Sequence, residues 1–193
     1  MVERARKIVV GICGASGVRY GVEVLRALGS AGVETHLVLS EWGERLLREE
    51  AAGDPGEVRA LARAAYGNQE LGALPSSSSF GADGMVIVPA TVKTVAAVAN
   101  ADASTLIARA ADTMLRLHRP LVVCLRETPL SAPCLENLAR LARYGATVLP
   151  LSPAFYHHPQ TIQDLYDFMT GKVLDSLGLP AEAFPRWRGP AQP

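Results

Sequence analysis

The sequence alternates short, apolar, β-branched segments with longer amphipathic ones, and this alternation limits the possible folds more than any other feature. Because the apolar segments contain few polar residues, each is predicted to form a strand buried on both faces. The expected strands are 7–12, 34–39, 85–88, 121–125 and 147–149. The expected helices are 20–30, 41–50, 58–66, 91–99, 104–118, 133–143 and 161–177. This order predicts an α/β fold with a mostly parallel sheet between two helical layers.

Charge and cysteine content exclude several classes of function. The 19 Lys and Arg residues balance the 19 Asp and Glu residues, so no positive surplus favours nucleic acid or an anionic membrane surface. The three cysteines show no C-x-x-C spacing, which argues against disulfides and structural zinc and favours the cytoplasm. The longest uncharged stretch, 144–163, contains three prolines and is not expected to span a membrane. We found no linker or internal repeat and expect one domain over 1–193.

A glycine-rich loop follows the first expected strand. Gly11, Gly14 and Gly17 have G-x-x-G-x-x-G spacing, which is neither the dinucleotide fingerprint nor the P-loop motif. Small residues let a ligand approach the backbone, and the following helix N-terminus favours an anion. The alternative is a tight strand–helix turn without a ligand.

Two more polar segments follow the second and third strands. Ser40 and the segment 89–94 (PATVKT) place hydroxyl and N–H groups at helix starts. Each by itself is explained by helix capping. Because the carboxyl ends of parallel strands share one edge, the three loops together indicate a groove for a phosphorylated, partly planar ligand.

Arginines are concentrated around the fourth strand. Arg109 and Arg116 share a helix face with Asp112, and Arg126 precedes Glu127 at the end of the strand. Such a group either forms a solvated, salt-bridged surface or binds phosphate oxygens. Glu127 would then be placed to donate a proton to a leaving group.

The last loop and the last helix contain further candidates. Tyr156 precedes a His157–His158 pair that lacks a third ligand at metal-site spacing, so we expect no metal. Tyr156 is suited either to bind an anion or to cover the core. Lys172, in the final helix, either faces solvent or contributes charge to the site.

Several segments together resemble the flavin prenyltransferase family of the UbiX/Pad type. The resemblance covers essentially the whole chain in order, and its most specific parts are RETP and FYHHP. The matching segments are 11–21 (GICGASGVRYG), 76–80 (SSSSF), 85–94 (MVIVPATVKT), 109–112, 119–121, 126–129 (RETP), 154–159 (AFYHHP) and 179–187 (LPAEAFPRW).

The resemblance implies a three-layer, Rossmann-like and flavodoxin-like fold, with reduced FMN and dimethylallyl phosphate as substrates. The product, prenylated FMN, would serve a UbiD-type decarboxylase, as in ubiquinone biosynthesis. A homododecamer is also implied, with 178–193 as a packing arm. No metal is required.

Residue roles follow from the same resemblance. FMN contacts are implied for Gly14, Ala15, Ser16, Ser40, Thr91, Val92, Lys93, Thr94 and Arg126. The dimethylallyl phosphate group is implied to lie near Tyr156, Lys172, Arg116 and Arg109. Catalytic roles are implied for Ser16, Glu127 and Glu50.

Three positions depart from the family pattern. Ala90-Thr91 replaces the usual Cys-Ser, Arg116 stands at a usual Lys, and Lys172 stands at a usual Arg. Two other functions stay open at this point. One is a non-catalytic carrier of FMN or prenylated FMN. The other is a flavin-dependent cysteine decarboxylase, which is disfavoured because the chain lacks a Met-Asn clamp and a His in its first helix.

Overall fold

The structure is a computed structural model that describes residues 5–180. Within this range, six parallel strands form one sheet in the order β3-β2-β1-β4-β5-β6. The strands are β1 (Lys7–Ile12), β2 (Glu34–Leu39), β3 (Ala64–Gly67), β4 (Gly84–Ala90), β5 (Leu121–Leu125) and β6 (Thr147–Val148). The α-helices are α1 (Arg19–Ser30), α2 (Glu41–Glu49), α3 (Pro55–Ala60), α4 (Val92–Ala99), α5 (Leu106–Arg116), α6 (Ala132–Arg143) and α7 (Ile162–Ser176), and two short 3-10 helices lie at Leu74–Ser76 and Ser78–Phe80.

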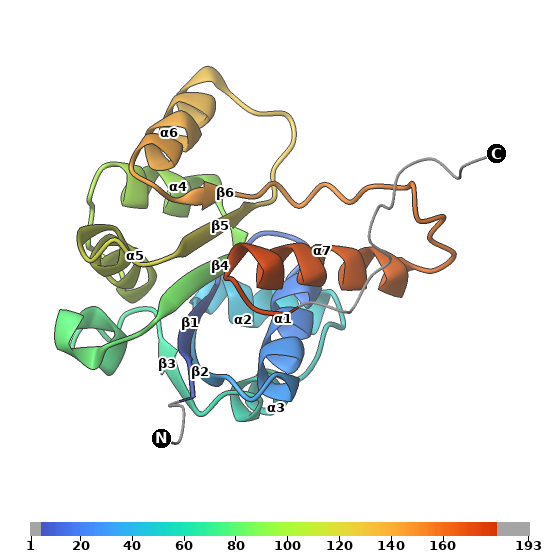
Figure 1. Cartoon of the computed structure of the whole chain (residues 1–193), viewed down its shortest axis with the longest axis horizontal. Coiled ribbons are helices and arrows are strands. Elements are labelled where there is room, and N and C mark those ends of the chain that lie inside the picture. The colour runs from blue at the N-terminus through green and yellow to red at the C-terminus, as the bar shows by residue number, and fades with distance from the viewer. Residues whose placement is uncertain (1–4, 181–193) are drawn as a thin grey trace.

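Helices cover both faces of the sheet (Figure 1). α1 and α7 pack against each other on one face, where α2 and α3 also lie. α4, α5 and α6 cover the opposite face. Successive strand side chains point to alternate faces, so Ile8 and Val10 join one apolar core while Val9 joins the other. These buried layers confirm the predicted three-layer α/β fold.

The strands are added to the sheet in two opposite directions, starting from β1. From β1 the chain builds outward through β2 and β3, and it then crosses to β4 and builds the other half. This is the strand order of the Rossmann fold, and without the edge strand β3 it is the flavodoxin order. Ligands of such sheets bind at the carboxyl ends of the strands beside this switch point.

The predicted helix 58–66 is wrong in its second half. α3 begins at Pro55, where Asp54 accepts hydrogen bonds from the first turn, and it ends at Ala60. The following residues form β3, in which Tyr66 lies opposite Val38 of β2. This edge strand is short and contains no β-branched residue. Its conformation depends on pairing with β2, which local sequence patterns do not reveal.

Smaller differences affect the other elements. β4 continues through Pro89 to Ala90, with an irregularity in its pairing with β5 after Ile87. Proline has no N–H for a ladder bond, which explains why the sequence suggested an earlier end. In the described part of the chain, no helix has the length and apolarity needed to cross a membrane. The expected arm 178–193 lies outside the described residues from 181 onward.

Candidate active site

Backbone hydrogen bonds join the carboxyl ends of the central strands. The N–H of Ser40 donates to the carbonyl of Ile12 at 3.0 Å, and the N–H of Cys13 donates to the carbonyl of Pro89 at 3.1 Å. These bonds extend the ladder beyond the strands and hold three polar loops side by side. The predicted meeting of these loops at one edge of the sheet is therefore confirmed.

Two helices begin at this edge with hydroxyl caps. Ser40 Oγ accepts a hydrogen bond from Gly43 N–H at 3.0 Å at the start of α2. Thr91 Oγ1 accepts one from Thr94 N–H at 3.1 Å at the start of α4. Both hydroxyls thus cap helices, as expected, and also lie beside the cavity described below.

The first N–H groups of α2 and α4 are available to a ligand. Within residues 5–180 they have no hydrogen-bond partner. The groups are those of Glu41 and Trp42 in α2 and of Val92 and Lys93 in α4. Unpaired N–H groups and the positive ends of helix dipoles together favour a phosphate or another anion.

A cavity of about 640 Å³ lies at this edge of the sheet. Five of the predicted site residues line it, namely Gly14, Ser40, Thr91, Lys93 and Thr94. Its other lining residues were not predicted, and they are Cys13, Glu41, Trp42, Asn68, Gln69, Ala96, Ala97, Asn100, Asp102, Ser104 and Thr105. Asn68 and Gln69 directly follow β3, the strand that the sequence pattern did not reveal. A correct prediction of β3 would have indicated both as candidate site residues.

Gly14 is required by close packing. A Cβ at this position would overlap the Cβ of Trp42, and it would lie only 3.1 Å from the Trp42 carbonyl carbon. The backbone of the glycine-rich loop therefore lies directly against the start of α2, and Gly14 and Trp42 both line the cavity. The neighbouring Ala15 is buried, whereas Ser16 is exposed in the loop.

The start of α1 is occupied by a carboxylate of the chain itself. Glu50 Oε2 accepts hydrogen bonds from Gly17 N–H at 2.9 Å and from Val18 N–H at 3.3 Å. Gly17 has a φ of +89°, a conformation that glycine adopts with little strain. The anion expected at this helix is thus supplied by Glu50, and the open positions for a ligand anion are at α2 and α4.

Cys13 lines the cavity and is buried. Its Sγ is 3.3 Å from Thr94 Oγ1, which in turn lies 3.0 Å from Thr91 Oγ1. Burial raises the pKa of the Cys13 thiol to about 11, against a smaller opposing effect of the contact with Thr94. The thiol is therefore protonated near neutral pH and contributes to this chain of hydrogen-bonding groups as an uncharged member.

Arg126 and Glu127 follow β5 at the same edge. The N–H of Arg126 donates to the carbonyl of Ala90 at 3.3 Å, and its side-chain Nε is buried without a hydrogen-bond partner. A buried guanidinium N–H without an acceptor is costly, which is consistent with a ligand that supplies one. Glu127 is exposed and accepts a hydrogen bond from the N–H of Thr128 at 2.9 Å.

Tyr156 and Lys172 gather around Phe168. The Tyr156 and Phe168 rings meet edge to face at 5.9 Å, and Lys172 Nζ lies 5.4 Å from the centre of the Phe168 ring. His157 stacks on the same ring at 5.0 Å. Residues from the loop after β6 and from α7 thus meet around one ring and do not line the cavity, and the donor-site roles of Tyr156 and Lys172 stay predictions. Among the described residues, no three His, Cys, Asp or Glu side chains are placed to hold a metal.

Arg109 and Arg116 do not reach the cavity in a single chain. Both are exposed on α5, and Arg116 Nε pairs with Asp112 at 2.8 Å, as the i, i+4 spacing allows. α5 starts beside the cavity at Thr105, and Arg116 lies at its other end, near the amino ends of the strands. Within the chain, Arg109 and Arg116 therefore lie apart from Arg126, and the phosphate roles of Arg109 and Arg116 stay predictions.

The fold, the cavity beside the glycine-rich loop and the open helix starts are consistent with a flavoprotein, and the model of the Flavoprotein family matches residues 2–174. Among curated proteins, the flavin prenyltransferase LpdB of Lactiplantibacillus plantarum is 48% identical over 95% of this chain and 99% of its own length. The mitochondrial flavin prenyltransferase PAD1 of Saccharomyces cerevisiae is 42% identical over 96% of this chain and 77% of its own. The chain belongs to the flavin prenyltransferase family of the UbiX type, which is a family of transferases.

Solved structures agree with this assignment. The crystal structure of AnUbiX in complex with FMN and dimethylallyl pyrophosphate has a TM-score of 0.94 and 44% identity, covering 96% of this chain and 99% of that one. A dodecameric, FMN-dependent UbiX-like decarboxylase from Escherichia coli has a TM-score of 0.92 and 40% identity, covering 95% and 100%. The cysteine decarboxylase TvaF has a TM-score of 0.63 at 17% identity over 90% and 98%, which shows a shared fold alone.

Proposed function

We propose that this protein joins the dimethylallyl group of dimethylallyl phosphate to N5 and C6 of reduced FMN and so forms prenylated FMN. The observation that carries the proposal is the cavity between the open starts of α2 and α4, which offers unpaired N–H groups and hydroxyl caps to a phosphorylated flavin. Its occurrence in a chain 48% identical to a flavin prenyltransferase favours this substrate over other phosphorylated ligands.

FMN fits the residues at this edge of the sheet. Gly14 leaves no room for a side chain and brings the backbone close to the ligand, while Ser40 and Thr91 supply hydroxyl groups. The buried Nε of Arg126 needs an acceptor, which a flavin or phosphate oxygen supplies. Reduced flavin contributes the nucleophilic nitrogen and carbon, so the protein itself has little covalent chemistry to perform.

The prenyl donor would bind near Tyr156 and Lys172. The Lys172 ammonium group and the Tyr156 hydroxyl would stabilise charge on the departing phosphate. Glu127 would protonate the leaving oxygen, and Ser16 would relay the proton lost on ring closure. Glu50 would act on the loop that carries Ser16, because its carboxylate binds Gly17 and Val18. Holding both substrates in contact accounts for most of the required catalysis.

Three further proposals concern the setting of the reaction. The product would be passed to a UbiD-type decarboxylase, and the enzyme would act in the cytoplasm. It would assemble as a homododecamer, since a 40% identical neighbour is described as dodecameric. Residues of another copy would then be able to complete the donor site.

Phosphate release tests the proposed reaction. The protein is incubated anaerobically with dimethylallyl phosphate and either reduced or oxidised FMN, and inorganic phosphate is measured. Release is expected only with reduced FMN, because the flavin must act as the nucleophile. Release that does not require reduced flavin would indicate simple hydrolysis and would contradict the proposal. A parallel series with the diphosphate, measuring pyrophosphate, identifies the preferred donor.

A further inference from the structure

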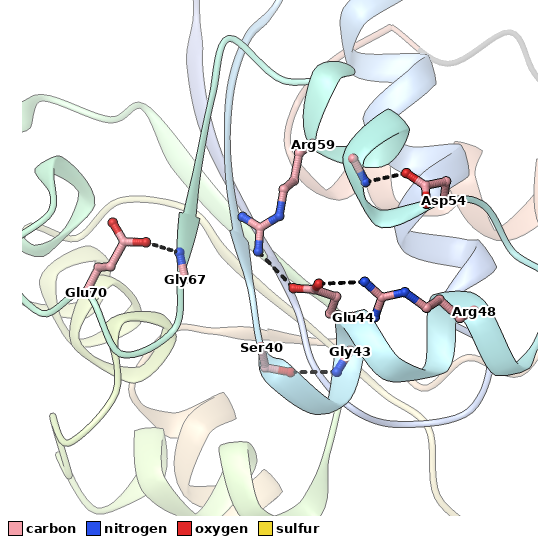
Figure 2. Close-up of polar contacts among 9 residues, drawn as sticks. Ser40, Gly43, Glu44, Arg48, Asp54, Arg59, Gly67 and Glu70 are labelled. Carbon is pink, nitrogen blue, oxygen red and sulfur yellow. Dashed lines mark hydrogen bonds and ion pairs between the residues drawn. The ribbon is translucent and has the colours of Figure 1, made fainter.

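The turn after β3 is held closed by its own residues. Gly67 N–H donates to Glu70 Oε1 at 2.6 Å, and Glu70 N–H donates to the Gly67 carbonyl at 3.1 Å. Figure 2 shows the Glu70 carboxylate directed at Gly67. The two residues between them, Asn68 and Gln69, line the cavity. The turn therefore presents these side chains from a fixed backbone.

Asn68 is also fastened to the start of α5. Its backbone carbonyl accepts a hydrogen bond from Leu106 N–H at 2.8 Å, and its side-chain Oδ1 accepts one from Ile107 N–H at 2.9 Å. Thr105 caps the same helix by accepting from Ala108 N–H through Oγ1 at 3.4 Å. Unlike α2 and α4, α5 has its first N–H groups paired with protein atoms, so its start offers none to a ligand.

These contacts determine the orientation of the Asn68 amide. An N–H group needs an acceptor, so the side-chain atom facing Ile107 must be the oxygen. The amide nitrogen is then the polar atom of this side chain that remains for a ligand. Within residues 5–180 this nitrogen has no hydrogen-bond partner. It is also not one of the buried polar atoms that lack a partner, so a ligand can reach it.

Asn100 lines the same cavity but has no such donor available. Its Nδ2 donates to the Ala96 carbonyl at 2.7 Å, and its Oδ1 accepts a hydrogen bond from Arg140. Both ends of the Asn100 amide are therefore used by the protein. The two asparagines differ in this respect although they line one cavity.

We propose that Asn68 is a flavin-binding residue whose Nδ2–H group donates a hydrogen bond to an oxygen of bound FMN. The inference rests on the proposed flavin site and adds the edge strand β3 to the elements that recognise the flavin. It assigns Asn68 two separable roles, since Oδ1 caps α5 while Nδ2 contacts the ligand.

The substitution Asn68→Asp separates these roles. A carboxylate of nearly the same shape keeps an acceptor for Ile107 N–H, and its negative charge suits a helix N-terminus. It replaces the donor with an acceptor, so the Kd for FMN is expected to rise roughly tenfold or more, with no fall in Tm. Asn100→Asp adds the same charge to the same cavity and is the matched control, with an expected change below about threefold because no ligand contact is lost.

Asn68→Ala provides a second comparison, because it removes both the cap and the donor. It is expected to lower both Tm and FMN affinity, whereas Asn68→Asp lowers affinity alone. Wild-type affinity in Asn68→Asp would overturn the proposal, and so would equal losses in Asn68→Asp and Asn100→Asp. A loss of affinity that follows Tm across the Asn68 variants would also overturn it. Failure of the wild-type protein to bind FMN would instead contradict the proposed function.

Discussion

The carboxylate of Glu50 accepts a hydrogen bond from the backbone N–H of Gly17 at 2.9 Å, immediately before α1. The end of α2 is thereby joined to the glycine-rich loop after β1. This contact fills the helix N-terminus at which the sequence alone predicts a ligand anion. At α2 and α4, by contrast, the first N–H groups have no partner among the described residues and can bind a ligand anion.

The first prediction concerns this contact. Glu50→Ala is expected to lower the free energy of unfolding by about 1–2 kcal/mol, because it removes charge-assisted hydrogen bonds at a helix N-terminus. Glu50→Gln keeps one carbonyl acceptor and is expected to lose less than half of that. Urea denaturation measures both variants. Equal stability of the alanine variant and the wild type would show that the contact does not hold the loop.

The second prediction concerns space at Gly14. Gly14→Ala is expected to weaken FMN binding by at least roughly tenfold, because the new methyl group overlaps Trp42 and forces the loop away from α2. Gly29→Ala is the control, since a Cβ there meets nothing within 4 Å, and it is expected to be neutral or slightly stabilising. Titration of each purified variant with FMN gives the comparison. Unchanged FMN affinity in Gly14→Ala would show that the position of the glycine-rich loop does not affect FMN binding.

The third prediction concerns pH and Glu44. Figure 2 shows this carboxylate between Arg59 and Arg48, at 3.1 and 2.9 Å, so that it joins α2 to α3. Hydrogen bonds from Arg59 and then Arg48 lower the pKa of Glu44 below its ordinary value of 4.5. The ionised form is favoured by folding, so this contribution is present above about pH 4.5 and lost as pH falls through the folded pKa.

Glu44→Gln tests this linkage. It is expected to cost about 0.5–1 kcal/mol at pH 7, the range for a partly exposed ion-pair network, and the difference should vanish toward pH 3. Glu49→Gln, which removes an exposed pair with Arg45, is the control and should cost less. Thermal unfolding over a pH series measures both. A stability difference between Glu44→Gln and the wild type that grows as pH falls would contradict the lowered pKa of Glu44.

The fourth prediction concerns thiol reactivity. All three cysteines are buried, and burial raises the pKa of each thiol, that of Cys13 to about 11. Because the thiolate is the reactive form, the native protein is expected to react very slowly with Ellman's reagent at pH 8. Three thiols should react after denaturation. Rapid reaction of one native thiol, abolished by Cys13→Ser, would contradict the protonated state assigned to Cys13.

The fifth prediction concerns the donor site. Lys172→Met keeps an unbranched side chain beside Phe168 but removes the charge. kcat/KM for dimethylallyl phosphate is expected to fall roughly ten- to hundredfold through the loss of a charge-assisted contact. FMN affinity should stay unchanged, because Lys172 does not line the flavin cavity. Wild-type kcat/KM in Lys172→Met would show that Lys172 does not contribute to the donor site.

Much of the fold could be predicted from the sequence, because its central strands are continuous apolar runs and its helices have periodic apolar faces. β3 could not, since an alanine-rich edge strand depends on its partner β2. Because β3 was not predicted, Asn68 was not predicted as a cavity residue either. Its place at the carboxyl end of a strand follows only once Gly67 is known to end β3. The helix caps Ser40 and Thr91 were predictable because capping is local. The contact of Glu50 with Gly17 was not, because it joins separate elements.

The mass of the flavin after anaerobic incubation with reduced FMN and dimethylallyl phosphate tests the central claim most directly. The account predicts that the extracted flavin gains the mass of one isoprene unit, and that this gain requires both substrates and the intact protein. FMN that binds tightly but is recovered with unchanged mass would contradict the claim and would favour a carrier of FMN instead.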